Sequence, residues 1–471
     1  MRSFKKNTDF QINYQRLAVA AFSVLLIVLH FVRIFDNNFW GDEAYTIRLS
    51  QMNFTEMLME TAADVHPPLY YFIVQLFCKL FGYSGAVYHL ASLVPYVIGI
   101  VVALTVIWKW FGMEASILFI LLSSLLETAV TYNVEVRMYS WGALFLLLSF
   151  LALYRIFTRN QTKDYVCFVL FSLGTAYTHY YCLISVAFLY IVLIGLALVK
   201  RKEYFKRTLI ACLVTVAAYL PWLIALIQTL RRTMGDFWML YIPYLKDCFG
   251  YMFSGSLQYV LFAVMLLAVA FSAWYQRKDC GKVLWLAAGL CSIFGTIMVG
   301  NVVSRLFRPV MIVRYLYPVS IIAWVLLAVG ISGCRRKCLY TGLLAAALLI
   351  TSGPQFMRTV QAEKTQNVLL QETLEATSRI AGAGNVIVTD LEYIDWTVGD
   401  YYYPGSEQIY MGDGVLPALT EGKDYWLMLS GKLSEEMTAE LQIQGYVSEI
   451  LVEQGIIGTN PVVVYELQES K

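Results

Sequence analysis

The sequence predicts a polytopic α-helical membrane protein of about eleven spans, followed by a small soluble C-terminal α/β domain. Of its 471 residues, 59% are hydrophobic and 14% are charged, whereas a soluble domain carries about a quarter charged residues. Apolar runs of roughly 17 to 24 residues recur along the chain, which is the length that a helix needs to cross about 30 Å of hydrocarbon. From Gln355 onward, charged and turn-forming residues return, and this change predicts a domain outside the membrane.

The apolar runs place the predicted spans. The run at Tyr165–Tyr177 is short for a span, and Leu69–Phe81, at about 13 residues, is too short to cross comfortably. We therefore expect Leu69–Phe81 to lie in the outer interface or to dip into it. The predicted spans are, in chain order, Leu17–Phe35, Val87–Trp110, Ala115–Thr131, Met138–Phe157, Tyr165–Tyr177, Leu183–Val199, Thr208–Thr229, Ser256–Tyr275, Val283–Val303, Leu316–Gly333 and Leu339–Gly353.

Basic residues indicate how these spans are oriented. If Leu69–Phe81 does not cross, the loops with Arg155–Lys163, Lys200–Arg207, Arg277–Lys282 and Arg335–Lys337 all face one side. Because Lys and Arg are enriched in cytoplasmic loops, that side is predicted to be the cytoplasm. The chain is then a multi-pass protein of the cell membrane with its N-terminus inside, and an odd number of spans places the C-terminal domain outside.

These patterns divide the chain into three parts. Residues 1–16 form a polar cytoplasmic segment, residues 17–354 form the membrane domain with a first exterior loop at 36–86, and residues 355–471 form the extracytoplasmic α/β domain. Within the last part, alternating apolar residues and turn signals predict strands at Asn385–Thr389, Asp424–Leu429 and Pro461–Glu466 and a helix at Ser434–Ile443.

Composition also narrows the class of function. The net charge of +2 gives no support for a nucleic-acid partner, so membrane lipids are the partners that composition predicts. The nine cysteines are scattered without a zinc or redox spacing, which is typical of small buried side chains rather than of a metal or disulfide site.

Unusual polar residues gather in the loops that this topology places outside. The adjacent carboxylates Asp42 and Glu43 follow the first span directly. By position alone they are typical of a solvated turn or a helix N-terminus, where acidic side chains are favoured. The same face also carries His66, the segment 135–137 and His179. Such one-sided clustering favours an active site open to the cell exterior.

Five short segments in a fixed order carry a family resemblance. They are Asp42-Glu43-Ala44 with the later His66-Pro67-Pro68-Leu69, then Glu135-Val136-Arg137-Met138-Tyr139-Ser140, Tyr177-Thr178-His179-Tyr180-Tyr181, Tyr219-Leu220-Pro221-Trp222 and Arg314-Tyr315-Leu316-Tyr317-Pro318. Together they resemble the GT-C-type glycosyltransferases, close to the bacterial branch of the protein O-mannosyltransferase and aminoarabinose-transferase superfamily. Each segment is weak alone, but five in the right order are a strong signal.

The resemblance implies transfer of a sugar from a polyprenyl-phosphate carrier to a glycan, lipid or protein acceptor on the outer face. This reaction needs a base for the acceptor hydroxyl and positive groups for the departing phosphate. Asp42 is the expected base, and Glu43 is expected to orient it, hold the acceptor or bind a divalent cation; no other cofactor is implied. Arg314 is the first candidate for the phosphate, because a guanidinium offers forked donors to its oxygens.

The remaining candidates each have a structural alternative. Arg137, Arg305 and Arg308 are further phosphate candidates, although Arg305 and Arg308 also fit a membrane-surface role in which the charge snorkels to water. Glu135 and Arg137 are close enough in sequence to pair on a loop, and His179 beside two tyrosines also fits an interfacial anchor. The expected substrate contacts are His66, Glu135, Tyr139, His179 and Tyr315.

One departure from the family leaves the substrates open. Mannosyltransferases follow the His-Pro-Pro-Leu with Gly-Lys, and aminoarabinose transferases place a Lys before their Pro-Pro. Here His66 precedes and Tyr70-Tyr71 follows, so neither the sugar nor the acceptor is determined. The rival interpretations are a flippase or transporter of lipid-linked sugar, which needs polar groups through the membrane depth and on both sides, and an inactive membrane scaffold.

Overall fold

The computed structural model describes residues 2–232, 241–307, 309–392, 394–412, 414–420 and 422–470. By packing, the chain divides into two compact units. The membrane unit comprises Met1–Ile34, Asn53–Tyr83 and Val87–Met357, and the α/β unit comprises Phe35–Met52, Ser84–Ala86 and Arg358–Lys471. Each unit is described below by itself.

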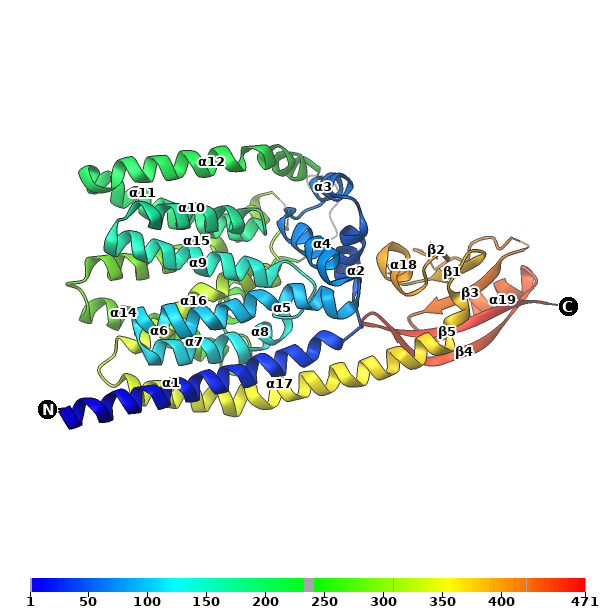
Figure 1. The fold of residues 1–471 in the computed structure, drawn as a ribbon. Helices are drawn as coiled ribbons and strands as arrows, with labels where there is room; N and C mark the ends of the chain where they lie inside the picture. Colours follow the sequence, from blue (N-terminus) through cyan, green and yellow to red (C-terminus); the bar gives the residue numbers. More distant parts are fainter. Residues whose placement is uncertain are drawn as a thin grey trace. The chain divides into compact units, whose positions relative to one another are not determined.

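The membrane unit is a bundle of helices, which Figure 1 shows running alongside one another. In the described part of the chain, nine helices are long and apolar enough to cross a membrane, so the predicted multi-pass helical class is confirmed. They are Tyr14–Phe35, Gly85–Phe111, Tyr139–Arg159, Tyr180–Val199, Lys202–Thr229, Gln258–Tyr275, Cys280–Leu306, Val313–Ser332 and Lys337–Ala376.

Two predicted spans form shorter helices. The run predicted at Ala115–Thr131 is divided into α7 (Met113–Leu125) and α8 (Glu127–Tyr132), because Leu126 adopts an extended conformation between them. The short run near Tyr165 forms α10 (Thr162–Ala176). The segment predicted to lie at the interface is the helix α4 (Leu69–Phe81), 13 residues long, with the bounds that its apolar run predicts.

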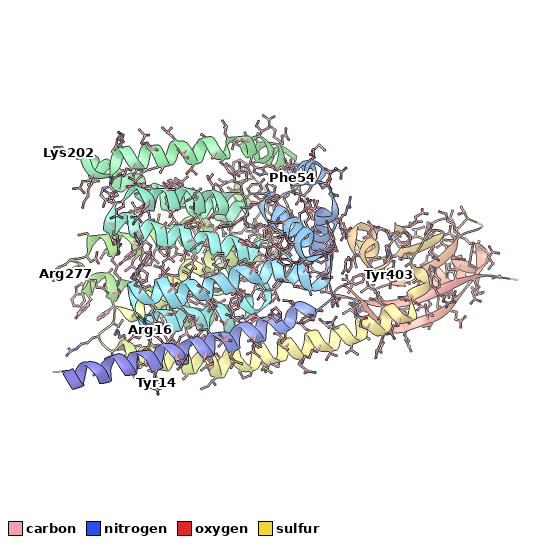
Figure 2. All side chains as sticks on the ribbon, in the orientation of Figure 1. Tyr14, Arg16, Phe54, Lys202, Arg277 and Tyr403 are labelled. Atoms are coloured by element: carbon pink, nitrogen blue, oxygen red, sulfur yellow. The ribbon has the colours of Figure 1, made fainter. Side chains whose placement is uncertain are left out.

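The turns at one end of the bundle are tight and carry the basic loops. Gly112, with φ of +99°, reverses the chain before α7, and this backbone conformation favours glycine. Lys202 and Arg277 lie at this end and Phe54 lies at the other (Figure 2). Placement of basic loops at a single end is what the predicted orientation requires.

The α/β unit is built on a five-stranded sheet of order β2-β1-β3-β5-β4. Strands β1 (Asn385–Thr389), β2 (Glu407–Tyr410) and β3 (Asp424–Leu429) are parallel, whereas β4 (Tyr446–Ile457) and β5 (Asn460–Glu469) pair antiparallel with each other and β5 with β3. Two separate groups of buried apolar side chains form the hydrophobic core of this unit. The three strands expected from sequence are confirmed, as is the helix α19 (Glu435–Ile443), which begins after its N-cap Ser434.

The two units divide the chain differently from the parts expected from sequence. The helix α17 (Lys337–Ala376) continues through Pro354 instead of ending near it, because the polar residues that follow still favour a helix. The return of charged residues near Gln355 therefore marks the point where the helix leaves an apolar environment, and not the end of the helix. Residues 35–52, expected in the membrane domain, pack with the α/β unit and include the helix α2 (Gly41–Gln51).

Candidate functional site

Four cationic or potentially cationic side chains from distant parts of the chain meet at one place in the membrane unit. We call His66, Arg137, His179 and Arg314 the Arg–His cluster. The His66 and His179 rings are 5.6 Å apart. Burial lowers the pKa of both histidines, and the charges of both arginines lower it further. The family segments that contain Arg137, His179 and Arg314 are thus brought together with the His66 part of the first segment.

Different local structures position these side chains. His66 lies between α3 (Phe54–Ala63) and α4, and Arg137 lies between α8 and α9 (Tyr139–Arg159). His179 is the N-cap of α11 (Tyr180–Val199), and Arg314 is in the 3₁₀ helix η3 (Val313–Leu316) that precedes α16 (Tyr317–Ser332). Helix ends and loops present polar side chains without placing them inside a membrane-spanning helix, where a charge is costly.

His179 is a neutral hydrogen-bond donor. Its Nδ1 accepts a hydrogen bond of 3.2 Å from the backbone N–H of Tyr181, so the ring proton is on Nε2. Burial, followed by the charges of Arg137 and Arg314, lowers the pKa of His179 to about 3. The Nε2 atom is buried and has no hydrogen-bond partner among the described residues, so this N–H is available for a ligand oxygen.

His66 is also neutral, and for the same reasons. Burial and then the charges of Arg137 and Arg314 lower its pKa well below the ordinary value. The ring of Tyr315 stands nearly perpendicular to that of His66, with 5.9 Å between centroids, and lies 5.0 Å from that of His179. The charge of the cluster is therefore carried by its two guanidinium groups.

The two arginines differ in burial. Arg137 is 2% exposed, and its backbone N–H donates to the carbonyl of Glu135 at 2.7 Å, which makes a tight turn. Arg314 is partly buried and lies over the ring of Tyr315, 5.9 Å from its centroid. Planar guanidinium groups in a partly dry site are suited to oxygens of a phosphate.

Tyr139 and Glu135 lie beside the cluster. Tyr139 is fully buried, with its ring 5.7 Å from that of His179 and 4.9 Å from that of Tyr132. Its hydroxyl has no hydrogen-bond partner in the part of the chain that the structure describes. Glu135 is half-buried in the same turn as Arg137. The structure therefore brings together all five predicted substrate-contact residues and two of the four predicted phosphate-binding arginines.

A cavity of about 290 Å³ opens beside the cluster. His66, His179 and Tyr315 are among its lining residues, and residues of α11, α12 (Arg201–Arg232) and α15 (Cys280–Leu306) supply most of the rest. A second, almost wholly apolar cavity of about 420 Å³ lies between α10, α11 and α12. Leu183 and Leu226 line both cavities, so two largely apolar cavities adjoin each other beside the cluster.

The other predicted residues are placed elsewhere or lie outside the description. Asp42 and Glu43 are in the first turn of α2, within the α/β unit. Arg305 is exposed near the end of α15, which agrees better with a surface role than with a buried phosphate site. Arg308 lies outside the described residues.

The surroundings of Glu43 bear on its predicted roles. Its carboxylate is buried and accepts a hydrogen bond of 3.3 Å from the backbone N–H of Trp40, a contact typical of the third residue of a helix. Among the described residues, no group of three or more His, Cys, Asp or Glu side chains is placed to hold a metal ion. The contact to Trp40 supports the helix-terminus alternative for Glu43.

Sequence reasoning missed two features. Tyr181 fixes the His179 tautomer through its backbone and donates its hydroxyl to the carbonyl of Val310 at 3.2 Å; no sequence signal marks a backbone donor. Arg33, buried in the first span, donates to the carbonyl of Val130 and lies 3.4 Å from Nδ1 of His30. A charged residue inside an apolar run is visible in the sequence and often marks a functional site. Arg33 instead contacts a backbone carbonyl, which is a structural role.

Comparisons with known proteins agree with these observations. A family model described as dolichyl-phosphate-mannose-protein mannosyltransferase matches residues 65–224, a range that contains His66, Arg137 and His179 but neither Asp42 nor Arg314. None of the curated proteins compared with the chain matches its sequence.

Two solved structures have the same fold over nearly the whole chain. The crystal structure of ArnT from Cupriavidus metallidurans in the apo state is 13% identical, with a TM-score of 0.60, and the match covers 95% of this chain and 98% of that one. The structure of the same protein bound to undecaprenyl phosphate is 14% identical, with a TM-score of 0.54 and coverage of 95% and 97%. The chain therefore has the fold of ArnT, a GT-C-type membrane glycosyltransferase, and the resemblance that its five segments predict is confirmed.

Proposed function

We propose that this protein is a glycosyltransferase that moves a sugar from a polyprenyl-phosphate carrier to an acceptor on the outer face of the cell membrane. The observation that supports this most directly is the Arg–His cluster, in which two guanidinium groups and two neutral histidines adjoin an apolar groove. A lipid phosphate has the matching form, with an anionic head and a long apolar chain. ArnT, which has the same fold, has been solved with undecaprenyl phosphate bound.

In this proposal the membrane unit binds the donor. Arg314 and Arg137 bind the phosphate oxygens, and the Nε2–H of His179 donates a further hydrogen bond. The polyprenyl chain lies in the apolar groove between α10, α11 and α12, whose volume is about 420 Å³. His66, Tyr139, Tyr315 and Glu135 contact the sugar or the acceptor.

The α/β unit supplies the base. The acceptor hydroxyl attacks the anomeric carbon of the sugar, and the bond from this carbon to the phosphate oxygen breaks as the new glycosidic bond forms. The carboxylate of Asp42 takes the hydroxyl proton, and the polyprenyl phosphate leaves with both bonding electrons. Fixed guanidinium groups stabilise the negative charge that develops on its oxygens. Glu43 orients the first turn of α2 through its contact with Trp40.

The proposed orientation places the Arg–His cluster and the α/β unit outside the cell. Lys200–Arg207 is then cytoplasmic, whereas His179 and Gln408 are extracytoplasmic. Single cysteines, placed at these positions in a chain cleared of its native cysteines, report their side through an impermeant thiol reagent on intact cells. A cysteine at position 203 should stay unlabelled until the cells are opened; labelling before that would reverse the orientation.

Two measurements test the enzymatic proposal. Glycolipids, wall polymers and exported glycoproteins of a deletion strain, analysed by mass spectrometry, should lack one sugar modification that the intact gene restores. The purified protein in lipid nanodiscs should bind radiolabelled undecaprenyl phosphate, and Arg137→Ala should weaken binding while Lys202→Ala, an exposed cation at the other end of the unit, should not. An unchanged envelope together with transport of the lipid-linked sugar across vesicle membranes would favour the flippase. An unchanged envelope without such transport would favour the scaffold.

A further inference from the structure

Residues 35–52 fold as part of the α/β unit, although they precede it by more than three hundred residues in the chain. The hydroxyl of Tyr402 donates to the carbonyl of Asn37 at 2.7 Å and accepts from the backbone N–H of Phe39 at 2.7 Å. The ring of Phe39 is fully buried and stands edge-on to Tyr401, with 5.3 Å between centroids. A single tyrosine therefore holds the approach to α2 by two backbone hydrogen bonds.

A second contact holds the first turn of α2 itself. The buried Thr397, in the π-helix η5 (Ile394–Val398), donates its hydroxyl to the carbonyl of Gly41 at 3.1 Å. One turn of helix away from Gly41, Ala44 is 2% exposed and belongs to the same hydrophobic core as Ile394 and Val398. Its small side chain lets α2 pack closely on η5.

These contacts also fix which face of α2 is turned away from the domain core. With 3.6 residues per turn, residues two apart point in directions roughly 160° apart around the helix. Because Ala44 points into the core, Asp42 points away from it. Asp42 is accordingly half-exposed, whereas Ala44 is buried.

We propose that Thr397 and Tyr402 are positioning residues for the reaction and that the C-terminal domain serves to hold α2 with the Asp42 carboxylate in its working orientation. This inference rests on the proposed function, because it gives the domain a part in the same transfer step. Neither residue touches the reacting atoms; both act through the backbone of residues 37–41. Burial raises the pKa of Tyr402 well above its ordinary value, so its hydroxyl remains a donor at any working pH.

The turn between β4 and β5 adds a third contact on the same segment. A Cβ atom on Gly458 would lie 2.8 Å from the carbonyl oxygen of Phe39, and Gly458 has a φ of +61°. Residues other than glycine rarely adopt this backbone conformation, and a side chain at position 458 would not fit against the Phe39 carbonyl. The approach to α2 is thus enclosed by two separate parts of the domain.

The test uses single hydroxyl deletions in the full chain. Tyr402→Phe and Thr397→Val remove the contacts to residues 37–41 with little change in shape, and Thr397→Ser restores the hydroxyl. Tyr465→Phe is the matched control, because its hydroxyl accepts from the backbone N–H of Leu433 at 2.9 Å, within the same domain and away from α2.

Amide hydrogen exchange over residues 39–51 is the first readout, because it requires no activity. Losing one buried hydrogen bond should raise exchange about five- to tenfold in Tyr402→Phe and Thr397→Val, but not in Thr397→Ser or Tyr465→Phe. Turnover should fall about tenfold in the same two variants, while binding of undecaprenyl phosphate stays within about twofold of the parent, since a misplaced base does not affect the phosphate.

The outcomes separate this inference from the proposed function. Faster exchange with unchanged turnover would overturn the positioning role and leave the glycosyltransferase intact. Unchanged exchange would show that the domain does not hold α2, and would overturn the inference directly. If the parent protein neither binds undecaprenyl phosphate nor restores a sugar to the deletion strain, the proposed function fails, and the positioning role fails with it.

Discussion

The two units of the molecule carry their polar residues in different ways. In the membrane unit, the Arg–His cluster is assembled from four loops and helix ends, and its charge lies on one buried and one partly buried guanidinium group beside neutral histidines. In the α/β unit, Asp42 and Glu43 are neighbours on one short helix, held by hydrogen bonds from residues of the same unit that lie more than 350 positions later in the chain. The cluster is suited to binding an anion, and the helix is suited to presenting a base. Substitutions in the two units should therefore separate donor binding from turnover.

The largest expected effect comes from the α/β unit. Asp42→Asn keeps the shape of the side chain and removes the basic oxygen, so turnover should fall by about 10²–10⁴, the usual contribution of a positioned base. Binding of undecaprenyl phosphate should be preserved. Single-turnover kinetics with a labelled lipid-linked sugar, together with equilibrium binding in nanodiscs, measure the two quantities separately.

Glu43→Gln is the matched neighbour for this test. The amide oxygen of Gln still accepts from the backbone N–H of Trp40, so the turnover should fall far less than in Asp42→Asn. A loss as large as that of Asp42→Asn, together with loss of the parent's turnover on treatment with a chelator, would indicate a metal at Glu43. Equal activity of Asp42→Asn and the parent would remove the base from the mechanism.

The membrane unit should show the opposite division. Arg137→Ala removes a buried guanidinium, and charged hydrogen bonds of this kind contribute about 1.5–3 kcal/mol, so undecaprenyl phosphate should bind about 10- to 100-fold more weakly. Arg314→Ala, at a more exposed position, provides a second variant with less risk to folding. Thermal melting of the purified variants in detergent checks that both are folded. Weaker turnover with unchanged donor binding would contradict the assignment of the cluster to the phosphate.

A smaller effect distinguishes charge from geometry at Arg314. Arg314→Lys keeps the positive charge but loses the forked donors, so its affinity for undecaprenyl phosphate should lie between those of the parent and Arg314→Ala. We expect the Arg314→Lys variant to bind undecaprenyl phosphate roughly three- to tenfold more tightly than the Arg314→Ala variant. If both variants bind like the parent, Arg314 anchors the chain at the membrane surface instead.

Local patterns allowed much of the membrane unit to be predicted. The lengths of apolar runs located nearly every long helix, and the extent of the apolar run at Leu69–Phe81 predicted the bounds of α4. The Arg–His cluster was also accessible, since short motifs at the ends of successive spans on one side of a membrane must share that surface. By contrast, the extended Leu126 that separates α7 from α8 has no comparable signal in a continuous apolar run.

The packing of residues 35–52 could not be predicted in the same way. The hydroxyl of Tyr402 and the backbone of Phe39 are 363 positions apart in the chain, and no local pattern indicates which tyrosine meets a given peptide group. Segments close to the first span were naturally assigned to the membrane domain. Similarly, the tautomer of His179 depends on the backbone N–H of Tyr181, which the side-chain sequence does not reveal.

The smallest expected effect concerns the neutral histidine and its dependence on pH. The pKa of His179 is lowered to about 3 from an ordinary value of 6.5, so between these values the unfolded chain binds a proton that the folded chain does not. Stability should therefore rise with pH across this window and be lost as the pH falls. His179→Asn offers a carbonyl oxygen to the Tyr181 N–H and an amide N–H in place of Nε2–H, but it does not titrate. Its melting temperature should fall less than that of the parent between pH 7 and pH 4.5, with proton uptake on unfolding smaller by up to about one proton. Donor binding at pH 7 should change only a few-fold, because the two guanidinium groups remain. An acid sensitivity identical to that of the parent would mean that His179 takes up its proton over the same pH range in the folded and the unfolded protein, and its surroundings would then not hold the ring neutral.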